Sequence, residues 1–487
     1  MDKLLFALIA GLLYPFAFSP WDWWPLVLLS VGLFWWSLNG ATARQGALRG
    51  LLFGLGSFGV GVSWLHVSMH QYGSTPMWLA VPMTGLFATV LALFPMALGW
   101  LNVRLGRRAL VFVGGWLLLD WLRGWLLTGF PWLYPGYAMI DTPLAGLAPW
   151  GGVWLVSLIT VASAVWLTEL VKRRGQREPA LLLLALAGWI VSLLPTSFTE
   201  EYGEPLPVAL AQGNVPQDVR WQLTQQAATR QIYAELTAQV SPGHLLIWPE
   251  AAITEFYQDA GTFLRQQGKL MADQQGALIT GIPWREWGNE GPVYYNSVTV
   301  LGGGEGLYHK QKLVPFGEYV PLQQQIRGLI PFFDLPASSF SRGGPDQPNL
   351  TALGLSISPF ICYEILYPSL VAQRSHNSDV LLTISNDAWF GTSAGPHQHF
   401  QMTRMRSLET GRWLLRATNN GITATIRPDG TVSDRLPQFE RALLETEVRT
   451  VRGTTPFMHT GPSPVLLLAL ALLALGRKRR PAATAGA

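Results

Sequence analysis

Long apolar runs separated by short polar connections fill the first 200 residues, and one more apolar run lies close to the C-terminal end. Apolar runs of about 20 residues are typical of helices that cross a membrane, although the first two runs and the last are shorter. The pattern predicts a membrane α-helical bundle of about eight transmembrane helices. The predicted spans are residues 4–19, 23–38, 47–69, 77–101, 108–128, 149–171, 179–196 and 459–476.

Residues 205–450 show a different pattern, in which short β-rich apolar runs alternate with helix-like stretches. This alternation is typical of a layered α/β domain. Strands are predicted at 208–211, 245–248, 277–280, 297–300, 355–357, 380–384 and 422–426, helices at 221–240, 256–275 and 397–416, and a hairpin turn at 428–430. The predicted domains are an N-terminal transmembrane bundle (1–200), an inserted α/β domain (205–450), a C-terminal transmembrane helix (455–480) and a disordered tail (481–487).

The composition is that of a membrane protein. Hydrophobic residues make up 49% of the chain and charged residues only 13%, which is far below the charge content of soluble proteins. The net charge of +4 is unevenly distributed, because residues 201–450 contain 18 Lys and Arg against 23 Asp and Glu. The excess of positive charge lies outside the α/β domain, so the charge pattern does not favour nucleic-acid binding.

Basic residues occupy alternate connections between the predicted spans, whereas the connections at 19–23, 70–76 and 129–148 contain no Lys or Arg. The positive-inside rule then predicts that both termini are cytoplasmic and that residues 205–450 lie on the opposite face of the membrane. The basic connections hold Lys3, Arg44, Arg49, Arg104, Arg107, Arg108, Lys172, Arg173, Arg174, Arg177, Arg477, Lys478, Arg479 and Arg480.

Three reactive side chains each follow a predicted strand: Glu250, Lys310 and Cys362, the only cysteine in the chain. A thiol attacks as its thiolate, and its ordinary pKa is about 8.5. A nearby carboxylate can take the thiol proton, and a nearby ammonium can stabilise both the thiolate and an oxyanion. The set therefore favours covalent catalysis over the alternative of an inert buried thiol.

The motifs around these residues resemble those of the nitrilase (carbon-nitrogen hydrolase) superfamily. They are Trp248-Pro249-Glu250, Lys310 followed by residues 313–318, and Cys362-Tyr363-Glu364. With the additional runs at 385–391 and 418–423, the segment 123–132 and the many-span frame, they resemble the bacterial apolipoprotein N-acyltransferase family. The resemblance covers nearly the whole chain and implies an α-β-β-α sandwich for the inserted domain.

The resemblance implies roles for individual residues. Glu250 is the expected general base, Lys310 the oxyanion stabiliser and Cys362 the nucleophile that carries the acyl chain as a thioester. Glu318, Tyr363 and Glu364 are expected to support the active site. The candidate substrate-binding residues are Trp221, Arg123, Phe332 and Phe333, of which the two phenylalanines lie on a loop that either sits at the membrane surface or packs within the domain.

The family's acyl donor is a membrane phospholipid, typically phosphatidylethanolamine, and its acceptor is the α-amino group of the diacylglyceryl-modified N-terminal cysteine of an apolipoprotein. The implied location is the bacterial inner membrane, with the catalytic domain in the periplasm. A monomer without metal or other cofactor and without nucleic acid is expected. Two half-reactions through one thioester predict ping-pong kinetics.

Several alternatives stay open at the level of single residues. Lys312 competes with Lys310, because residues two apart on an extended segment face the same side. Glu364 is either a structural partner or a catalytic group. His397 and His399 form a pair typical of metal ligands or, more commonly, of hydrogen-bonded structural groups. Arg123 either pairs with Asp120 or binds a lipid phosphate, and Trp221 either lines the acyl pocket or packs in the core.

Two other functions compete with acyl transfer. A membrane-anchored carbon-nitrogen hydrolase (amidase) would use the same Glu-Lys-Cys triad with water as the acceptor. A transporter or scaffold would carry a catalytically inactive domain, but repeated spans and further charged residues within the membrane, which are typical of transporters, are not evident in the sequence.

Overall fold

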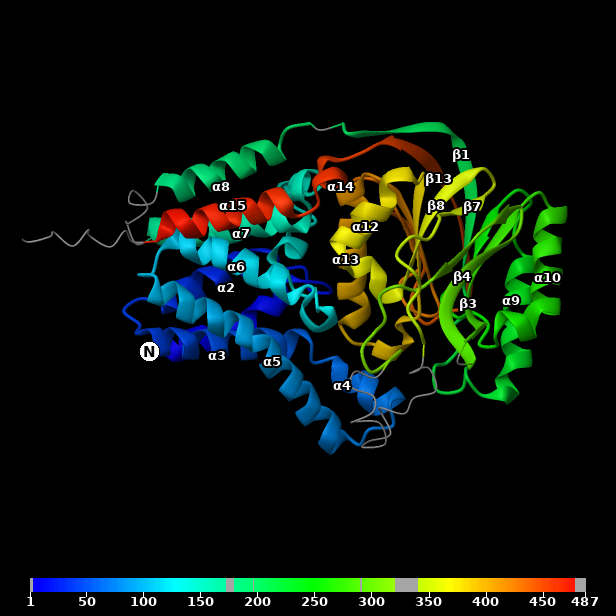
Figure 1. Cartoon of the computed structure of the whole chain (residues 1–487), viewed down its shortest axis with the longest axis horizontal. Helices are drawn as coiled ribbons and strands as arrows, with labels where there is room; N and C mark the ends of the chain where they lie inside the picture. Colours follow the sequence, from blue (N-terminus) through cyan, green and yellow to red (C-terminus); the bar gives the residue numbers. More distant parts are fainter. Residues whose placement is uncertain (1–2, 172–178, 196, 290, 320–339, 478–487) are drawn as a thin grey trace, which may run out of the picture. The chain divides into compact units, whose positions relative to one another are not determined.

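The computed structural model describes residues 3–171, 179–195, 197–289, 291–319 and 340–477. The chain forms two compact units, each built from separate stretches of sequence (Figure 1). The helical unit comprises Met1–Ser63, Met83–Pro195 and Pro462–Ala487, and the α/β unit comprises Trp64–Pro82 and Thr196–Gly461. The α/β unit thus includes a short segment that overlaps the end of one predicted membrane span and the start of the next.

The helical unit consists of apolar helices joined by short turns. Its α-helices are α1 (Lys3–Leu13), α2 (Pro25–Ser37), α3 (Ala43–Gly61), most of α5 (Met77–Arg104), α6 (Ala109–Arg123), α7 (Ala148–Val171), α8 (Pro179–Ser192) and α15 (Ser463–Gly476). Short 3-10 helices lie between them at η1 (Tyr14–Ala17), η3 (Leu126–Thr128), η4 (Pro135–Met139) and η5 (Pro143–Leu147).

Two helical stretches in the described part of the chain are long and apolar enough to cross a membrane, namely Met77–Arg104 and Pro143–Val171. A third candidate is the pair formed by α3 and Leu65–Tyr72, which are bent by 53° relative to one another. The span predicted at 47–69 is thus a broken helix in the structure, because Val62 has a non-helical backbone after a glycine-rich stretch. The remaining predicted spans correspond to shorter helices.

Glycines allow α3 and α5 to pack closely. A Cβ atom on Gly50 would lie 2.1 Å from the carbonyl oxygen of Pro95, and one on Gly54 would lie 2.6 Å from Cα of Ala92. A Cβ atom on Gly99 would lie 2.1 Å from the carbonyl oxygen of Gly46. Gly46, Gly50 and Gly54 recur every four residues and so share one helix face. Small residues at this spacing are typical of helix pairs in membranes.

The α/β unit contains two sheets. The first has the strand order β13-β1-β2-β3-β4-β6 and the second the order β12-β11-β10-β9-β8-β7-β5. The first half of the unit supplies β1 (Thr199–Gln212), β2 (Leu245–Ile247), β3 (Ala277–Gly288), β4 (Gly291–Gly302), β5 (Gly304–Glu305) and β6 (Leu307–His309). The second half supplies β7 (Leu350–Ala352), β8 (Leu355–Ile361), β9 (Val380–Ser385), β10 (Trp413–Thr418), β11 (Ala424–Ile426), β12 (Val432–Arg435) and β13 (Ala442–Gly453).

Helices cover the outer faces of both sheets, which gives an α-β-β-α sandwich (Figure 1). The longer helices are α9 (Gln226–Ala238), α10 (Tyr257–Asp273), α12 (Pro368–Arg374) and α13 (Gly395–Thr410). The shorter ones are α4 (Leu65–Val67), η7 (Leu223–Gln225), η9 (Cys362–Leu366), η10 (Ser375–Asn377), η11 (Asp387–Phe390), α14 (Pro456–Thr460) and the π-helical turn η2 (Ser68–Tyr72).

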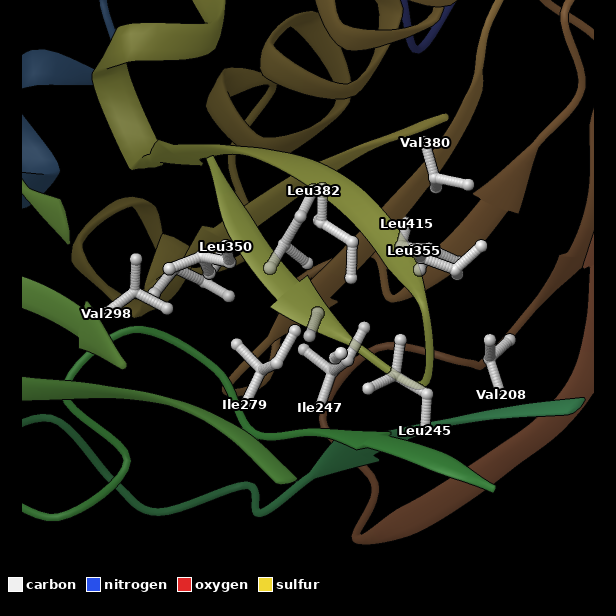
Figure 2. Packing of buried hydrophobic residues seen from close by; sticks show 14 of the residues in the cluster. Val208, Leu245, Ile247, Ile279, Val298, Leu350, Leu355, Val380, Leu382 and Leu415 are labelled. Atoms are coloured by element: carbon white, nitrogen blue, oxygen red, sulfur yellow. The ribbon is translucent and has the colours of Figure 1, made fainter. Parts of the chain in front are cut away.

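The core follows from the alternation of side chains along the strands. Leu245 and Ile247 on β2 point between the sheets, and Leu246 and Trp248 face the helices α9 and α10. Because both faces are buried, the strand reads as a continuous apolar run. Figure 2 shows the apolar side chains of the two sheets meeting between them, with Ile247 and Ile279 from one sheet and Leu382 and Leu415 from the other.

The seven strands predicted from the sequence are confirmed, as is the turn at 428–430 between β11 and β12. The helix predicted at 397–416 is wrong at its C-terminal end. α13 stops at Thr410, Gly411 adopts φ 59°, and residues from Trp413 form β10. Glycine in this left-handed conformation is a common helix terminus. The long edge strand β13 was not predicted, since its charged residues hide the alternation.

Candidate active site

The predicted reactive residues follow strands that end at corresponding edges of the sheets. β2 runs parallel to β1 and β3, and β8 runs parallel to β9 and β10. Glu250 follows β2, Lys310 follows β6 and Cys362 follows β8. The carboxyl ends of such strands are where α/β domains present functional groups. The backbone thus delivers a carboxylate, an ammonium and a thiol to one region.

Two carboxylates flank the ammonium of Lys310. Its Nζ lies 2.9 Å from Oε1 of Glu318 and 3.3 Å from Oε1 of Glu250. The side-chain amide of Asn296 donates to the same two oxygen atoms, at 2.8 Å each. The second oxygen of Glu250 accepts from the backbone N–H of Asn386 at 2.9 Å. All four side chains are buried, so the charges interact with little screening.

The two lysines differ in their surroundings: Lys310 contacts both carboxylates, whereas the ammonium of Lys312 lies over the ring of Tyr367, 5.4 Å from its centroid. Burial lowers the pKa of Lys310, but the carboxylates of Glu318 and Glu250 outweigh burial and raise this pKa well above its ordinary value. Lys310 therefore stays positively charged at neutral pH.

Cys362 begins the short helix η9, with a backbone φ of 54°. This left-handed conformation is uncommon for a residue other than glycine and often marks a functional site. Burial raises the pKa of the thiol above its ordinary value, and the charge of Glu250 raises it further, whereas Lys310 acts in the opposite direction. At neutral pH the side chain is therefore a thiol that must lose its proton before it can attack.

Glu364 ties the cysteine turn to the lysine segment. Its Oε2 accepts from the backbone N–H of Ile361 at 2.8 Å. Its Oε1 accepts from the hydroxyl of Tyr308 at 2.9 Å and from the backbone N–H groups of Gln311 and Lys312 at 2.6 and 3.1 Å. Burial raises the pKa of Glu364, although these backbone donors oppose the shift. With both oxygens engaged, the carboxylate is placed to orient the site.

Tyr363 is buried beside the nucleophile, and its ring meets that of Tyr367 edge to face, with centroids 5.4 Å apart. Burial raises the pKa of Tyr363, so its hydroxyl stays protonated. Trp221 is exposed next to Arg220, which donates to the backbone oxygens of Glu250 and Ala251. Trp221 therefore lies near the turn that carries Glu250.

The other predicted substrate-binding residues are Arg123, Phe332 and Phe333. Arg123 belongs to the helical unit, where its guanidinium pairs with Asp120 at 2.8 Å and donates to the backbone oxygens of Phe130 and Trp132. These contacts favour the internal pair over a lipid phosphate. Phe332 and Phe333 lie outside the described residues.

Sequence reasoning missed three polar residues of the site. Asn296 lies within an apolar strand, Arg220 lies on a loop and Asn386 follows β9. Asn386 bonds Gln217 and Asn419 in addition to Glu250. A polar residue inside an apolar strand was the available signal for Asn296, because buried amides require partners. Among the residues that the structure covers, no group of three or more His, Cys, Asp or Glu is arranged to hold a metal ion.

Residues 207–455 match the carbon-nitrogen hydrolase family, and residues 10–166 match the apolipoprotein N-acyltransferase N-terminal domain. The sandwich and its Glu-Lys-Cys group thus place the α/β unit among the carbon-nitrogen hydrolases, here joined to a helical membrane domain.

Full-length relatives narrow this class. The apolipoprotein N-acyltransferase of Azotobacter vinelandii is 47% identical over 99% of this chain and 96% of its own length. The one from Pseudomonas syringae pv. tomato is 46% identical over 96% of this chain and 95% of its own length, and the one from Methylococcus capsulatus is 38% identical over 99% and 98%. The chain belongs to the apolipoprotein N-acyltransferase family, which confirms the resemblance and the class of enzyme.

Proposed function

We propose that this enzyme transfers an acyl chain from a membrane phospholipid, through a thioester on Cys362, to the α-amino group of the N-terminal diacylglyceryl-cysteine of an apolipoprotein. The observation that carries the assignment of residues is the pairing of Lys310 with both Glu250 and Glu318. The charges of Glu250 and Lys310 also act on the pKa of Cys362. This arrangement supplies a nucleophile, a base and a fixed positive charge.

In the first half-reaction, Sγ of Cys362 attacks an ester carbonyl of the phospholipid and Glu250 takes the thiol proton. The ammonium of Lys310 stabilises the negative charge that develops on the carbonyl oxygen. The intermediate then expels the lysophospholipid alkoxide, which receives the proton from Glu250. A raised thiol pKa fits this sequence, because proton removal coupled to attack avoids a free thiolate in a buried site.

In the second half-reaction, the neutral α-amino group of the apolipoprotein attacks the thioester. Lys310 again stabilises the oxyanion, and Glu250 takes a proton from the nitrogen. The C–S bond breaks, and the departing sulfur receives that proton, which restores the thiol. Glu318 and Asn296 act as positioning residues, because they hold Lys310 and Glu250 in place.

We further propose that the shorter apolar helices also cross the membrane, which gives about eight spans and the domain limits 1–200, 205–450 and 455–480. The distribution of basic residues supports cytoplasmic termini and a periplasmic catalytic domain. Phosphatidylethanolamine is the proposed donor, and the enzyme is proposed to act as a monomer at the bacterial inner membrane.

The test of the carrier is intact-mass analysis after incubation with phospholipid alone. An adduct with the mass of one acyl chain is expected, and hydroxylamine should remove it because it cleaves thioesters. Cys362→Ala serves as the control, and it leaves the chain without cysteine. A wild-type enzyme that turns over phospholipid without ever carrying this adduct would exclude the thioester mechanism.

The amidase alternative uses the same residues with water as the acceptor, so the products must decide between them. Purified enzyme given phospholipid and a diacylated lipopeptide is expected to form the triacylated lipopeptide. Release of ammonia from simple amides, without a triacylated product, would instead support the amidase.

A further inference from the structure

Arg220, on the loop after β1, is a buried cation that the proposed reaction does not use. It is only 1% exposed. Its Nη2 donates to the backbone oxygen of Glu250 at 3.3 Å and to that of Ala251. In the described part of the chain, Nε and Nη1 of Arg220 have no hydrogen-bond partner, so the guanidinium bonds to this one turn alone. A buried charge is unfavourable unless its surroundings bond it, and here the turn at Glu250 supplies those bonds.

The turn that Arg220 contacts carries the proposed base. Ala251, directly after Glu250, has a backbone φ of 44°. This left-handed conformation is uncommon for a residue with a Cβ atom and persists only where the surroundings hold it. On one side the turn is fixed to β3, because the N–H of Ala252 donates to the backbone oxygen of Gly281 at 3.1 Å. On the other side, Arg220 holds the carbonyl groups of Glu250 and Ala251.

The loop of Arg220 is itself tied to the site. The hydroxyl of Thr254, four residues after Glu250, donates to the backbone oxygen of Arg220 at 3.0 Å. Three residues before Arg220, the side-chain oxygen of Gln217 accepts from the amide of Asn386 at 2.6 Å. The backbone N–H of Asn386 in turn donates to Oε2 of Glu250 at 2.9 Å. The loop therefore reaches Glu250 by two routes, through its main chain and through its carboxylate.

We propose that Arg220 is a positioning residue that holds the main chain of the turn at Glu250 and Ala251, and thereby keeps the carboxylate of Glu250 in its contacts with Lys310 and Asn296. This inference rests on the proposed role of Glu250 as the general base. It assigns a function to a buried cation that touches the base through backbone atoms only.

Two substitutions of Arg220 separate its hydrogen bonds from its bulk. Arg220→Met keeps an apolar side chain of similar reach along the stem but has no donor. Arg220→Lys keeps a charged donor on a flexible chain, which can restore a bond to the turn. The matched control is Arg265→Met, which removes an exposed arginine of α10.

The measurements are the rate of thioester formation at saturating phospholipid, the phospholipid concentration that gives half that rate, and the melting temperature. Arg220→Met is expected to form the thioester roughly 10-fold more slowly, because hydrogen bonds from a charged donor are lost. The half-saturating concentration should stay unchanged, since the buried guanidinium is not available to a ligand. Arg220→Lys should recover most of the rate, and Arg265→Met should match the wild type.

The decisive comparison repeats Arg220→Met in the Glu250→Gln background, where no carboxylate is left to position. Residues that act as one unit are not additive, so Arg220→Met should lower the remaining rate by less than about 3-fold there. If Arg220 served only the stability of the fold, the loss of roughly 10-fold would recur in both backgrounds. The melting temperature should fall in both backgrounds, because two buried carbonyl groups lose their donor.

The same factor of loss in both backgrounds would overturn the proposal, and so would a wild-type rate in Arg220→Met or an equal loss in Arg220→Met and Arg220→Lys. If Arg220→Met does not fold, Arg220→Gln takes its place in the two backgrounds, since its amide is too short to hold both carbonyl groups, and the same outcomes apply. A Glu250→Gln enzyme that forms the thioester at the wild-type rate would contradict the proposed function itself, and this inference with it. A slow Glu250→Gln enzyme with additive losses would contradict the role of Arg220 alone.

Discussion

The side-chain amide of Asn296 donates to Oε1 of Glu250 at 2.8 Å. The backbone oxygen of the same residue accepts from the N–H of Lys310 at 2.8 Å. A single position on β4 therefore holds the proposed base through its side chain and the proposed oxyanion stabiliser through its backbone. The backbone contact remains when Asn296 is substituted. Variants of this side chain therefore remove only the contact between its amide and the carboxylates.

Asn296→Ala is expected to lower the rate of acyl transfer by about 10- to 100-fold, since a hydrogen bond to a charged group contributes about 1.5–3 kcal/mol. The assay is formation of the triacylated lipopeptide at saturating substrates. Asn289→Ala, an exposed asparagine at the end of β3, is the control. Wild-type activity in Asn296→Ala would show that the carboxylates do not need this donor.

Lys310→Met should lower acyl transfer, whereas Lys312→Met should largely retain it, although the two lysines are only two residues apart. Removal of Lys310 takes away the oxyanion stabiliser and leaves Glu250 and Glu318 buried without their cation, which costs about 3–5 kcal/mol of stability. Both acyl transfer and the melting temperature should fall. Lys312→Met removes only the contact with Tyr367 and should retain most of the activity. Loss of activity in Lys312→Met alone would contradict the assignment.

Glu250→Gln should affect thiol reactivity and acyl transfer in opposite directions. Burial raises the pKa of Cys362 most, and the negative charge of Glu250 adds to it. Without that charge the thiol pKa falls, so alkylation at pH 7 should become faster than in the wild type. Acyl transfer should drop by about 10²- to 10⁴-fold, because the base is lost. Glu255→Gln, on the same loop but paired with Arg230, is the control. Slower alkylation in Glu250→Gln would refute this electrostatic coupling.

The reactive residues were accessible from the sequence because each follows a recognisable apolar strand. Residues such as Glu250 and Cys362 keep a fixed relation to a strand end, which local pattern reveals. Asn296 and Arg220 have no such relation, since their roles depend on how distant strands and loops meet. The choice between Lys310 and Lys312 likewise depended on side-chain direction after β6, which strand alternation alone left open.

In the membrane part, hydropathy predicted the positions of helices but not a break within one of them. Hydropathy predicts where apolar helices lie, and α5 and α7 follow the prediction closely. It did not predict that the helix at 47–69 would break after Gly61, because side-chain hydropathy is insensitive to backbone conformation. The segment after the break instead packs with η11, where Ser68 donates to the backbone oxygen of Trp389 at 2.7 Å.

The depressed pKa of Asp387 predicts that the folded state loses stability in acid. Burial alone would raise its pKa, but Arg416 and His399 lower it to about 2. A carboxyl group whose pKa is depressed in the folded state stabilises the fold at pH values above its unfolded-state pKa of about 4. This contribution to stability disappears as the pH falls from 4 to 2. The contribution is about 2 kcal/mol. The melting temperature of the wild type should therefore fall over this interval more steeply than that of Asp387→Asn. The exposed Asp273→Asn on α10 should follow the wild type.

Gly50→Ala and Gly59→Ala test the packing of the helical unit with one helix as its own control. A Cβ atom on Gly50 would lie 2.1 Å from the backbone oxygen of Pro95, whereas one on Gly59 would meet no atom within 4 Å. Alanine favours a helix over glycine by about 0.8–1 kcal/mol, so Gly59→Ala should keep or raise the melting temperature in detergent. Gly50→Ala should lower it, because forcing α3 and α5 apart costs about 1–3 kcal/mol and exceeds the gain in propensity. Equal melting temperatures for the two variants would mean that α3 and α5 do not pack through this glycine face.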